Sequence, residues 1–427
     1  MSIGLQRRRF RKFAEIYGIY SAYFTIFAES IPQNLLYLRK ISFYIMIQRQ
    51  IEPLIARLLG SGKAIIIMGA RQVGKSTLLH QLFDSQENVL WMNGDDADVR
   101  TILSDITSTR LKALLANQKI LIINEAQRIN DFGLKLKLIT DQIPEVQVIA
   151  TGSSSFELAS KVNESLTGRK REFRMFPLSF REIVDATDLL TEQRLIPHRL
   201  VYGYYPEAVT NPGDEREVLR ELSSSYLYKD ILQLDGIAKP DKLATLIQAL
   251  ARQIGNIISY RELSMLVGID AKTVERYIDL LEKSYIIYRL GSFSRNLRNE
   301  LKNGKKIYFY DNGIRNAVIG DFRPAEIRDD VGALWENFVL TERLKQISYS
   351  RSFTNIRFWR TTEQKEIDII EDTDGRLSAF EIKWNPAKAK TGVPAKFAAA
   401  YPDASFKVII FDLWKLKFFQ TNIINTV

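Results

Sequence analysis

The stretch "AIIIMGARQVGKSTLLHQL", residues 64–82, decides the fold of this chain. The apolar run 64–68 predicts a buried strand, and the residues after position 75 predict a helix. Between them lies the pattern G-x-x-x-x-G-K-S, whose glycines let backbone N–H groups face phosphate oxygens at a helix N-terminus. Lys75 would reach the β- and γ-phosphates, and the Ser76 hydroxyl would ligate magnesium. The sequence therefore predicts a nucleotide site made of Gly69, Ala70, Arg71, Gln72, Val73, Gly74, Lys75, Ser76 and Thr77.

Three more apolar strands are predicted at 89–93, 120–124 and 148–152, with helical stretches between them. This alternation indicates a parallel sheet covered on both faces. The strand predicted at 120–124 lies in "KILIINEAQRI" (119–129), where Asn124 ends the strand and Glu125 directly follows it. A glutamate at this point is a candidate general base that polarises the attacking water. The alternative is an ordinary carboxylate at the end of a strand.

Asn124 departs from the aspartate that a nucleotide-hydrolysing enzyme of this layout would carry before Glu125. Asparagine keeps an oxygen acceptor of similar shape but lacks the negative charge, which weakens a magnesium site without reshaping it. Our hypothesis is that nucleotide and Mg²⁺ still bind while hydrolysis is slow or conditional.

Two further motifs supply candidate residues. In "TGSSSFEL" (151–158), Ser153 and Ser154 stand at a strand end, where a hydroxyl could sense the γ-phosphate; a helix N-cap explains them equally well. In "SLTGRKREF" (165–173), Arg169 is a candidate arginine finger, which would imply that subunits of an oligomer act on each other. The alternative is a surface cation in a basic run.

The chain resembles a known family in an ordered set of motifs: "GARQVGKSTLL", "LIINEAQ", "ATGSSSFEL", "SLTGRKREF", "FPLSFREI", "YGYYPEAV" and "SYLYKDIL". They resemble the bacterial and archaeal AAA-type ATPases that join the ATPase to a winged helix and a C-terminal domain of unknown function. The resemblance runs from about residue 46 to the C-terminus. It implies an ATP-binding protein and names no substrate. Asn124 is the departure from the family pattern, and it puts hydrolysis rather than binding in doubt.

Residues 186–250 read as helices, and 259–293 read as two short helices followed by a β-like run. Ser259 and Asp270 are plausible N-caps of the two helices, which together suggest a winged helix-turn-helix. DNA reading would need basic and amide side chains on the second helix. That helix is charge-balanced, so packing or a protein partner is favoured over DNA.

A second chemistry is suggested by Glu336, Asp368, Glu381 and Lys383, which match a restriction-endonuclease-like pattern. Period-two spacing puts Glu381 and Lys383 on one face of their strand. The carboxylates could hold magnesium while Lys383 positions an attacking water. The alternatives are an inactivated fold or charged residues that only pair with each other.

Composition sets the outer bounds. The 427 residues include no cysteine and two histidines, which excludes disulfides and thiolate or histidine-rich metal sites and fits a reducing cytoplasm. Residues 1–45 hold seven basic and two acidic residues, half of the net charge of +10. The rest is only mildly basic, which is weak evidence for DNA as a partner. The uncharged stretch 16–28 is too short for stable membrane insertion. We expect translation to begin at Met46.

The predicted fold class is α/β: a P-loop NTPase parallel sheet, followed by a winged-helix domain and an α/β restriction-endonuclease-like domain. The expected segments are a non-native or peripheral extension at 1–45, a P-loop AAA-type ATPase domain at 46–185, a helical connector at 186–250, a winged helix-turn-helix at 251–325 and a restriction-endonuclease-like domain at 326–427. The predicted function is ATP binding with slow or conditional hydrolysis, through which the nucleotide state controls the later domains. The alternatives are a Mg-dependent DNA nuclease gated by ATP and a non-hydrolysing switch that scaffolds a partner.

Overall fold

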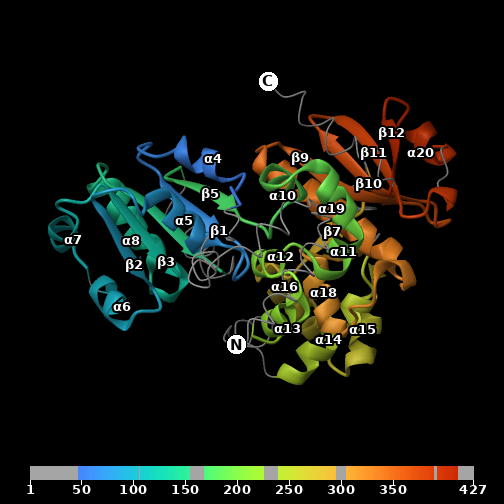
Figure 1. Cartoon of the computed structure of the whole chain (residues 1–427), viewed down its shortest axis with the longest axis horizontal. Coiled ribbons are helices and arrows are strands. Elements are labelled where there is room, and N and C mark those ends of the chain that lie inside the picture. The colour runs from blue at the N-terminus through green and yellow to red at the C-terminus, as the bar shows by residue number, and fades with distance from the viewer. Residues whose placement is uncertain are drawn as a thin grey trace, which may run out of the picture.

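The computed structural model of the chain describes residues 47–104, 106–153, 168–225, 239–294, 304–388 and 392–411. The predicted extension 1–45 and Ser154 lie outside these ranges. Figure 1 shows a parallel-sheet domain on one side and a larger body on the other, which contains a helical region and, at its upper edge, the C-terminal sheet. Within the described ranges no helix is both long and apolar enough to cross a membrane.

The first sheet has five parallel strands in the order β2-β3-β4-β1-β5. Because the sheet is covered by helices, every side chain of β1 is buried. This confirms the predicted parallel α/β sheet, although β5 was not anticipated by the sequence. The strands are β1 (Ala64–Met68), β2 (Val89–Asn93), β3 (Ile120–Asn124), β4 (Gln147–Gly152) and β5 (Lys170–Arg174).

Helices and one short 3₁₀ turn connect these strands, and α10 follows the sheet. The turn η1 begins directly after Glu125, and α5 begins directly after the last glycine of the predicted phosphate loop. The elements are α4 (Glu52–Ala56), α5 (Lys75–Phe83), α6 (Ala97–Ser104), α7 (Ser108–Leu114), η1 (Ala126–Arg128), α8 (Phe132–Gln142) and α10 (Phe180–Ala186).

A helical region follows, and it includes a three-stranded antiparallel sheet of order β6-β8-β7. Two predicted N-caps are confirmed: Ser259 accepts from the Glu262 N–H and Asp270 from the Thr273 N–H. The elements are α11 (Leu189–Tyr202), α12 (Pro206–Thr210), α13 (Glu215–Ser225), α14 (Pro240–Arg252), β6 (Ile257–Ile258), α15 (Tyr260–Val267), α16 (Ala271–Lys283), β7 (Ile287–Gly291), β8 (Lys305–Phe309), α18 (Asn312–Ile319) and η3 (Ala325–Ile327).

His198 is packed within this helical region, where its ring contacts that of Tyr202. Burial, with a smaller effect from the charge of Arg199, lowers the pKa of His198 to about 4. The Glu215 carboxylate lies 3.3 Å from Nε2 and would favour the charged imidazole. Removal from water outweighs this attraction, because the side chain is mostly buried.

The C-terminal region packs α19 against a four-stranded sheet of order β12-β11-β10-β9, in which only the β11–β12 pair is parallel. The helix predicted around Glu336 is present as α19. The elements are α19 (Val331–Tyr349), β9 (Thr354–Arg360), β10 (Glu366–Thr373), β11 (Arg376–Lys383), η4 (Pro386–Lys388), α20 (Ala395–Ala400) and β12 (Ser405–Ile410).

Candidate nucleotide site and a second charged cluster

Two glycines of the predicted phosphate loop are required by the backbone. A Cβ on Gly69 would lie 2.1 Å from the carbonyl oxygen of Met175, because the chain leaving β5 runs alongside the loop. Gly74 has φ 93° and is the N-cap of α5, and this left-handed conformation favours glycine. The loop therefore turns at the N-terminus of α5, where backbone N–H groups lack helical partners.

Lys75 is buried, and its ammonium donates to the carbonyl oxygens of Gly69 (2.9 Å) and Ala70 (2.7 Å). Ser76 and Thr77 are exposed in the first turn of the same helix. A cation folded over its own loop at the N-terminus of a helix fits a nucleotide phosphate. These residues would hold ATP.

Asn124 ends β3 at the same edge of the sheet, separated from β1 by β4 alone. Its Oδ1 accepts a hydrogen bond of 3.1 Å from the Thr151 hydroxyl on β4. One lone pair of that oxygen is thus already used, and the amide carries no negative charge. Asn124 fits a water-mediated, weak magnesium contact.

Glu125 follows with φ 49°, which is an uncommon conformation for a non-glycine residue and one found at functional sites. The neighbouring Gly94 makes room for it, because a Cβ there would lie 2.3 Å from the Glu125 carbonyl oxygen. The Glu125 carboxylate accepts from Gln127 Nε2 at 2.6 Å and lies 3.5 Å from Ser153 Oγ. The turn and these contacts therefore fix the orientation of the Glu125 carboxylate.

Gln127 was missed by the sequence analysis, although it lies in "IINEAQ". Its Nε2 also donates to Ser153 Oγ at 3.0 Å, so the side chain bridges the ends of β3 and β4. Its Oε1 is buried and has no hydrogen-bond partner among the described residues. Gln127 is a positioning residue for Glu125. The structure thus brings Ser153 to the Glu125 cluster.

Arg169 lies at the opposite end of the sheet. Its carbonyl oxygen accepts from the N–H of Ala64, the first residue of β1, whereas the phosphate loop follows the last. At about 3.3 Å per residue, the length of β1 separates Arg169 from the start of the phosphate loop by about 16 Å. Its guanidinium pairs with Asp141 at 2.5 Å. Arg169 therefore lies far from the phosphate loop of its own chain.

Arg49 was also missed by the sequence analysis, and its side chain is hydrogen-bonded to the phosphate loop. It is buried, and its guanidinium donates to the carbonyl oxygens of Val73 (2.6 Å) and Phe176 (2.7 Å). Its Nε pairs with Glu182 Oε1 at 3.0 Å. No residue pattern around "IQRQIEPL" indicated this role, because the partners are 24 to 133 positions away.

The segment 175–182, here called the linking segment, joins this loop to α19. At one end the Met175 N–H donates to Met68 O at 2.7 Å. Further along, Glu342 on α19 accepts from the Phe180 N–H at 2.9 Å, and Lys345 donates to Leu178 O at 2.8 Å. The linking segment is therefore hydrogen-bonded at one end to the last residue of β1, which precedes the phosphate loop, and further along to α19.

A second charged cluster lies in the C-terminal region and contains the four residues predicted there. Lys383 Nζ lies 2.6 Å from Glu381 and 3.6 Å from Asp368, and the Ile382 N–H donates to Asp368 at 2.7 Å. Burial, and then the charges of Glu336 and Glu381, raise the pKa of Asp368 to about 8. The fold thus brings Glu336, Asp368, Glu381 and Lys383 together.

Lys306 on β8 enters the same cluster and was not predicted. Its buried ammonium lies 3.3 Å from Glu336 and 2.5 Å from Glu366. Lys306 and Lys383 therefore pair with carboxylates that a divalent cation would otherwise attract. Over the described ranges, no group of three or more carboxylates or histidines is arranged to hold a metal ion. As arranged, this cluster does not fit magnesium.

Comparisons with known proteins agree with the nucleotide site. Residues 61–184 match the family model described as "AAA domain". Residues 193–325 and 331–417 match two models of domains of unknown function, DUF8612 and DUF4143. The AAA match supports a P-loop ATPase family for the first domain, and with it ATP binding and ATPase activity.

Relatives extend over most of the chain. An uncharacterized protein of Mycobacterium tuberculosis (strain ATCC 25618 / H37Rv) is 27% identical over 352 residues, which are 81% of this chain and 75% of the relative. One of Haemophilus influenzae (strain ATCC 51907 / DSM 11121 / KW20 / Rd) is 26% identical over 351 residues, 75% of this chain and 83% of the relative. Among solved structures, a Walker-type ATPase of Pyrococcus abyssi is 14% identical with a TM-score of 0.46, covering 64% of this chain and 95% of its own.

Proposed function

We propose that the chain binds ATP and hydrolyses it slowly or only under a condition set by its other domains. One observation carries the proposal: a phosphate loop with a buried Lys75 lies at the same sheet edge as a carboxylate, Glu125, held in a strained turn. Strain of this kind costs about 1–3 kcal/mol and persists only where the surrounding structure holds it, here through the Gln127 contact and the close approach to Gly94.

Each residue has a role in this proposal. Lys75 leaves the loop carbonyls and donates to β- and γ-phosphate oxygens, while the N–H groups of residues 69–77 bind the phosphates. Glu125, oriented by Gln127, accepts the proton of the attacking water. Ser76 and Asn124 would hold Mg²⁺, which supplies positive charge against the phosphates. Because Asn124 is neutral, Mg²⁺ is held weakly and turnover is slow.

The linking segment supports control of the later domains by the nucleotide. The Val73 carbonyl belongs to the loop that receives the phosphates, and Arg49 ties it to Phe176 and Glu182. Since the same segment is bonded to α19, a displacement of the loop would be felt at the helix that carries Glu336. Packed interiors transmit such shifts because they have low compressibility.

We further propose that residues 251–325 form a winged helix that binds a protein partner. The order α14, β6, α15, α16, β7, β8 and the antiparallel sheet support this assignment. The charged residues of α16 are balanced, with three basic side chains (Lys272, Arg276 and Lys283) and three acidic ones (Glu275, Asp279 and Glu282), so the helix itself offers no net positive charge to DNA. Cytoplasmic location and an oligomer in which Arg169 acts on a neighbouring subunit belong to the same proposal.

The experiment is ATP binding and phosphate release by the purified chain with magnesium. Loss of release in Lys75→Ala, with release unchanged in the exposed control Lys112→Ala, is the expected result. Binding without release would favour the alternative function, a non-hydrolysing switch that scaffolds a partner. Absence of ATP binding by the unaltered chain would overturn the proposal.

A second candidate, a DNA nuclease gated by ATP, is favoured by the convergence of Glu336, Asp368, Glu381 and Lys383 in one cluster. This candidate requires the Lys306 ammonium to leave Glu336 before a metal could enter. The test is DNA cleavage in magnesium with and without ATP. Cleavage lost in Lys383→Ala and kept in the exposed control Lys396→Ala supports the candidate. Cleavage that persists in Lys383→Ala refutes it.

A further inference from the structure

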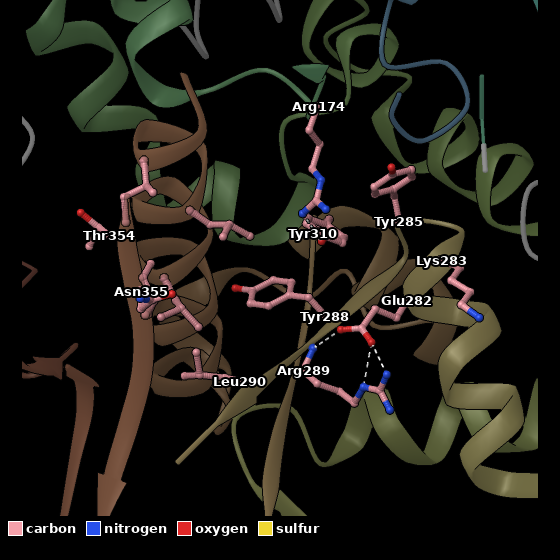
Figure 2. Close-up of a pocket in the computed structure, with 14 residues that line it drawn as sticks. Arg174, Glu282, Lys283, Tyr285, Tyr288, Arg289, Leu290, Tyr310, Thr354 and Asn355 are labelled. Atoms are coloured by element: carbon pink, nitrogen blue, oxygen red, sulfur yellow. Dashed lines mark hydrogen bonds and ion pairs between the residues drawn. The ribbon is translucent and has the colours of Figure 1, made fainter. Parts of the chain in front are cut away.

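A cavity of about 330 Å³ lies where the nucleotide domain meets the rest of the chain. Its walls come from the end of β5, the α16–β7 turn, the residue after β8, one face of α19 and the start of β9 (Figure 2). A volume of this size is at the small end of ligand pockets in proteins. The cavity is distinct from the nucleotide site and from the cluster around Asp368.

The cavity is positive at one end. Arg174, at the last position of β5, extends its guanidinium toward Tyr310 in Figure 2. The guanidinium donates to the Tyr310 hydroxyl at 3.2 Å and lies 5.3 Å from the ring centre of Tyr285. Within the described ranges no carboxylate forms an ion pair with it. Arg174 is exposed and lines the cavity, so a bound anion can reach its remaining donors.

The other charges of the wall do not neutralise Arg174. Glu282 is the lining carboxylate, and it is held by Arg289 through contacts of 2.5 and 2.7 Å. Arg289 also pairs with Asp279 at 2.7 Å. With Asp279 included, three basic side chains (Arg174, Lys283 and Arg289) stand against two carboxylates, which leaves one positive charge in excess. An anionic ligand is therefore favoured over a neutral or cationic one.

The cavity has both polar and apolar walls. Tyr288 and Tyr310 present their rings on one side, and their centroids are 4.9 Å apart. Tyr288 packs against α19, where its hydroxyl lies 3.0 Å from that of Thr341. The partly exposed Leu344 and Ile347 of α19 and Ile356 of β9 supply further apolar wall. A planar or aliphatic group between these walls would be removed from water at about 25 cal/mol per Å² of apolar surface. Arginine donates to carboxylate and phosphate oxygens in a fork that fixes the orientation of such a ligand.

We propose that this cavity binds a small organic anion, whose carboxylate or phosphate group contacts Arg174 and whose apolar body lies against Leu344 and Ile347 of α19 and Ile356 of β9. Ligand binding at this site would also affect the phosphate loop of the nucleotide domain. Arg174 is followed by Met175, whose carbonyl oxygen lies against Gly69 of the phosphate loop. The proposal concerns binding alone and does not depend on ATP hydrolysis.

The test uses calorimetric titration of the full chain with phenylacetate and phenyl phosphate, beside the neutral phenylacetamide. We expect at least one anion to bind while the amide does not, and the comparison of the two anions identifies the preferred head group. Arg174→Gln should weaken binding at least tenfold, whereas Arg171→Gln, an exposed arginine of the same strand, should leave it unchanged.

A second variant keeps the proposal testable even if Arg174→Gln misfolds. Asn355→Trp, at an exposed position of β9 that lines the cavity, should fill the site and abolish binding with Arg174 intact. Equal binding by the unaltered chain, Arg174→Gln and Asn355→Trp would overturn the proposal. Absence of binding by both anions to the unaltered chain would overturn it as well.

Discussion

Replacement of Arg49 by methionine tests the support of the phosphate loop. The change keeps much of the apolar stem and removes the donors to Val73, Phe176 and Glu182. Glu182 is 1% exposed and would keep its contacts with the N–H groups of Gln50 and Ser179, both at 2.8 Å. Breaking a buried pair by removing one partner costs about 3–5 kcal/mol. Because Glu182 keeps two donors, we expect about 3 kcal/mol.

The assay is native-state hydrogen exchange of the β1 amides, since a single unfolding free energy is poorly defined for a chain of several domains. Arg49→Met, Glu182→Gln and the double variant form a cycle, in which we expect a coupling energy of about 2 kcal/mol. ATP affinity should fall about tenfold in Arg49→Met, which corresponds to about 1.4 kcal/mol. The exposed Arg57→Met is the control. A loss below about 1 kcal/mol, or additive effects, would refute the reasoning.

Three further changes test the site and the helical region. Asn124→Asp restores the negative charge and should raise ATP turnover about tenfold at limiting magnesium, whereas unchanged turnover contradicts a weakened metal contact. Glu125→Gln should keep ATP binding and lower phosphate release by about 10²–10⁴-fold, and an active variant would remove its assignment as general base. His198 has a pKa of about 4 in the folded chain, below its ordinary 6.5, so its stabilising effect is full above pH 6.5 and is lost as pH falls toward 4. His198→Gln should flatten this acid dependence, by at most about 3 kcal/mol, in native-state hydrogen exchange of the α11 amides measured between pH 4 and 7; an unchanged slope would contradict it.

Local chemistry explains why part of the site could be predicted. Gly69, Gly74, Lys75 and Ser76 lie within eight positions, and their function depends on a turn between a strand and a helix. Apolar runs identified β1, β3 and β4, because strands buried on both faces carry little polar sequence. The run VLWM identified β2 as well, although that strand lies at the edge of the sheet and is partly exposed. The N-caps at Ser259 and Asp270 were predictable for the same reason, since a cap acts over three residues.

The missed residues act over long sequence distances. Arg49 contacts partners 24, 127 and 133 positions away, and Lys306 joins the C-terminal cluster from a strand outside the predicted motif. The strand β5 has the sequence KREFR, with four charged residues in five, and it was hidden because it lies at the edge of its sheet.

The sequence by itself determined the phosphate loop, the parallel sheet and the identity of the residues at the ends of β3 and β4. Each of these follows from periodicity, glycine spacing or a cap, which are local properties of the chain. Only the tertiary structure decided that Arg49 holds the loop, that Lys306 neutralises Glu336 and that Arg174 faces a cavity. Those contacts join segments that meet only when the domains pack, and the burial that makes them strong arises at the same step.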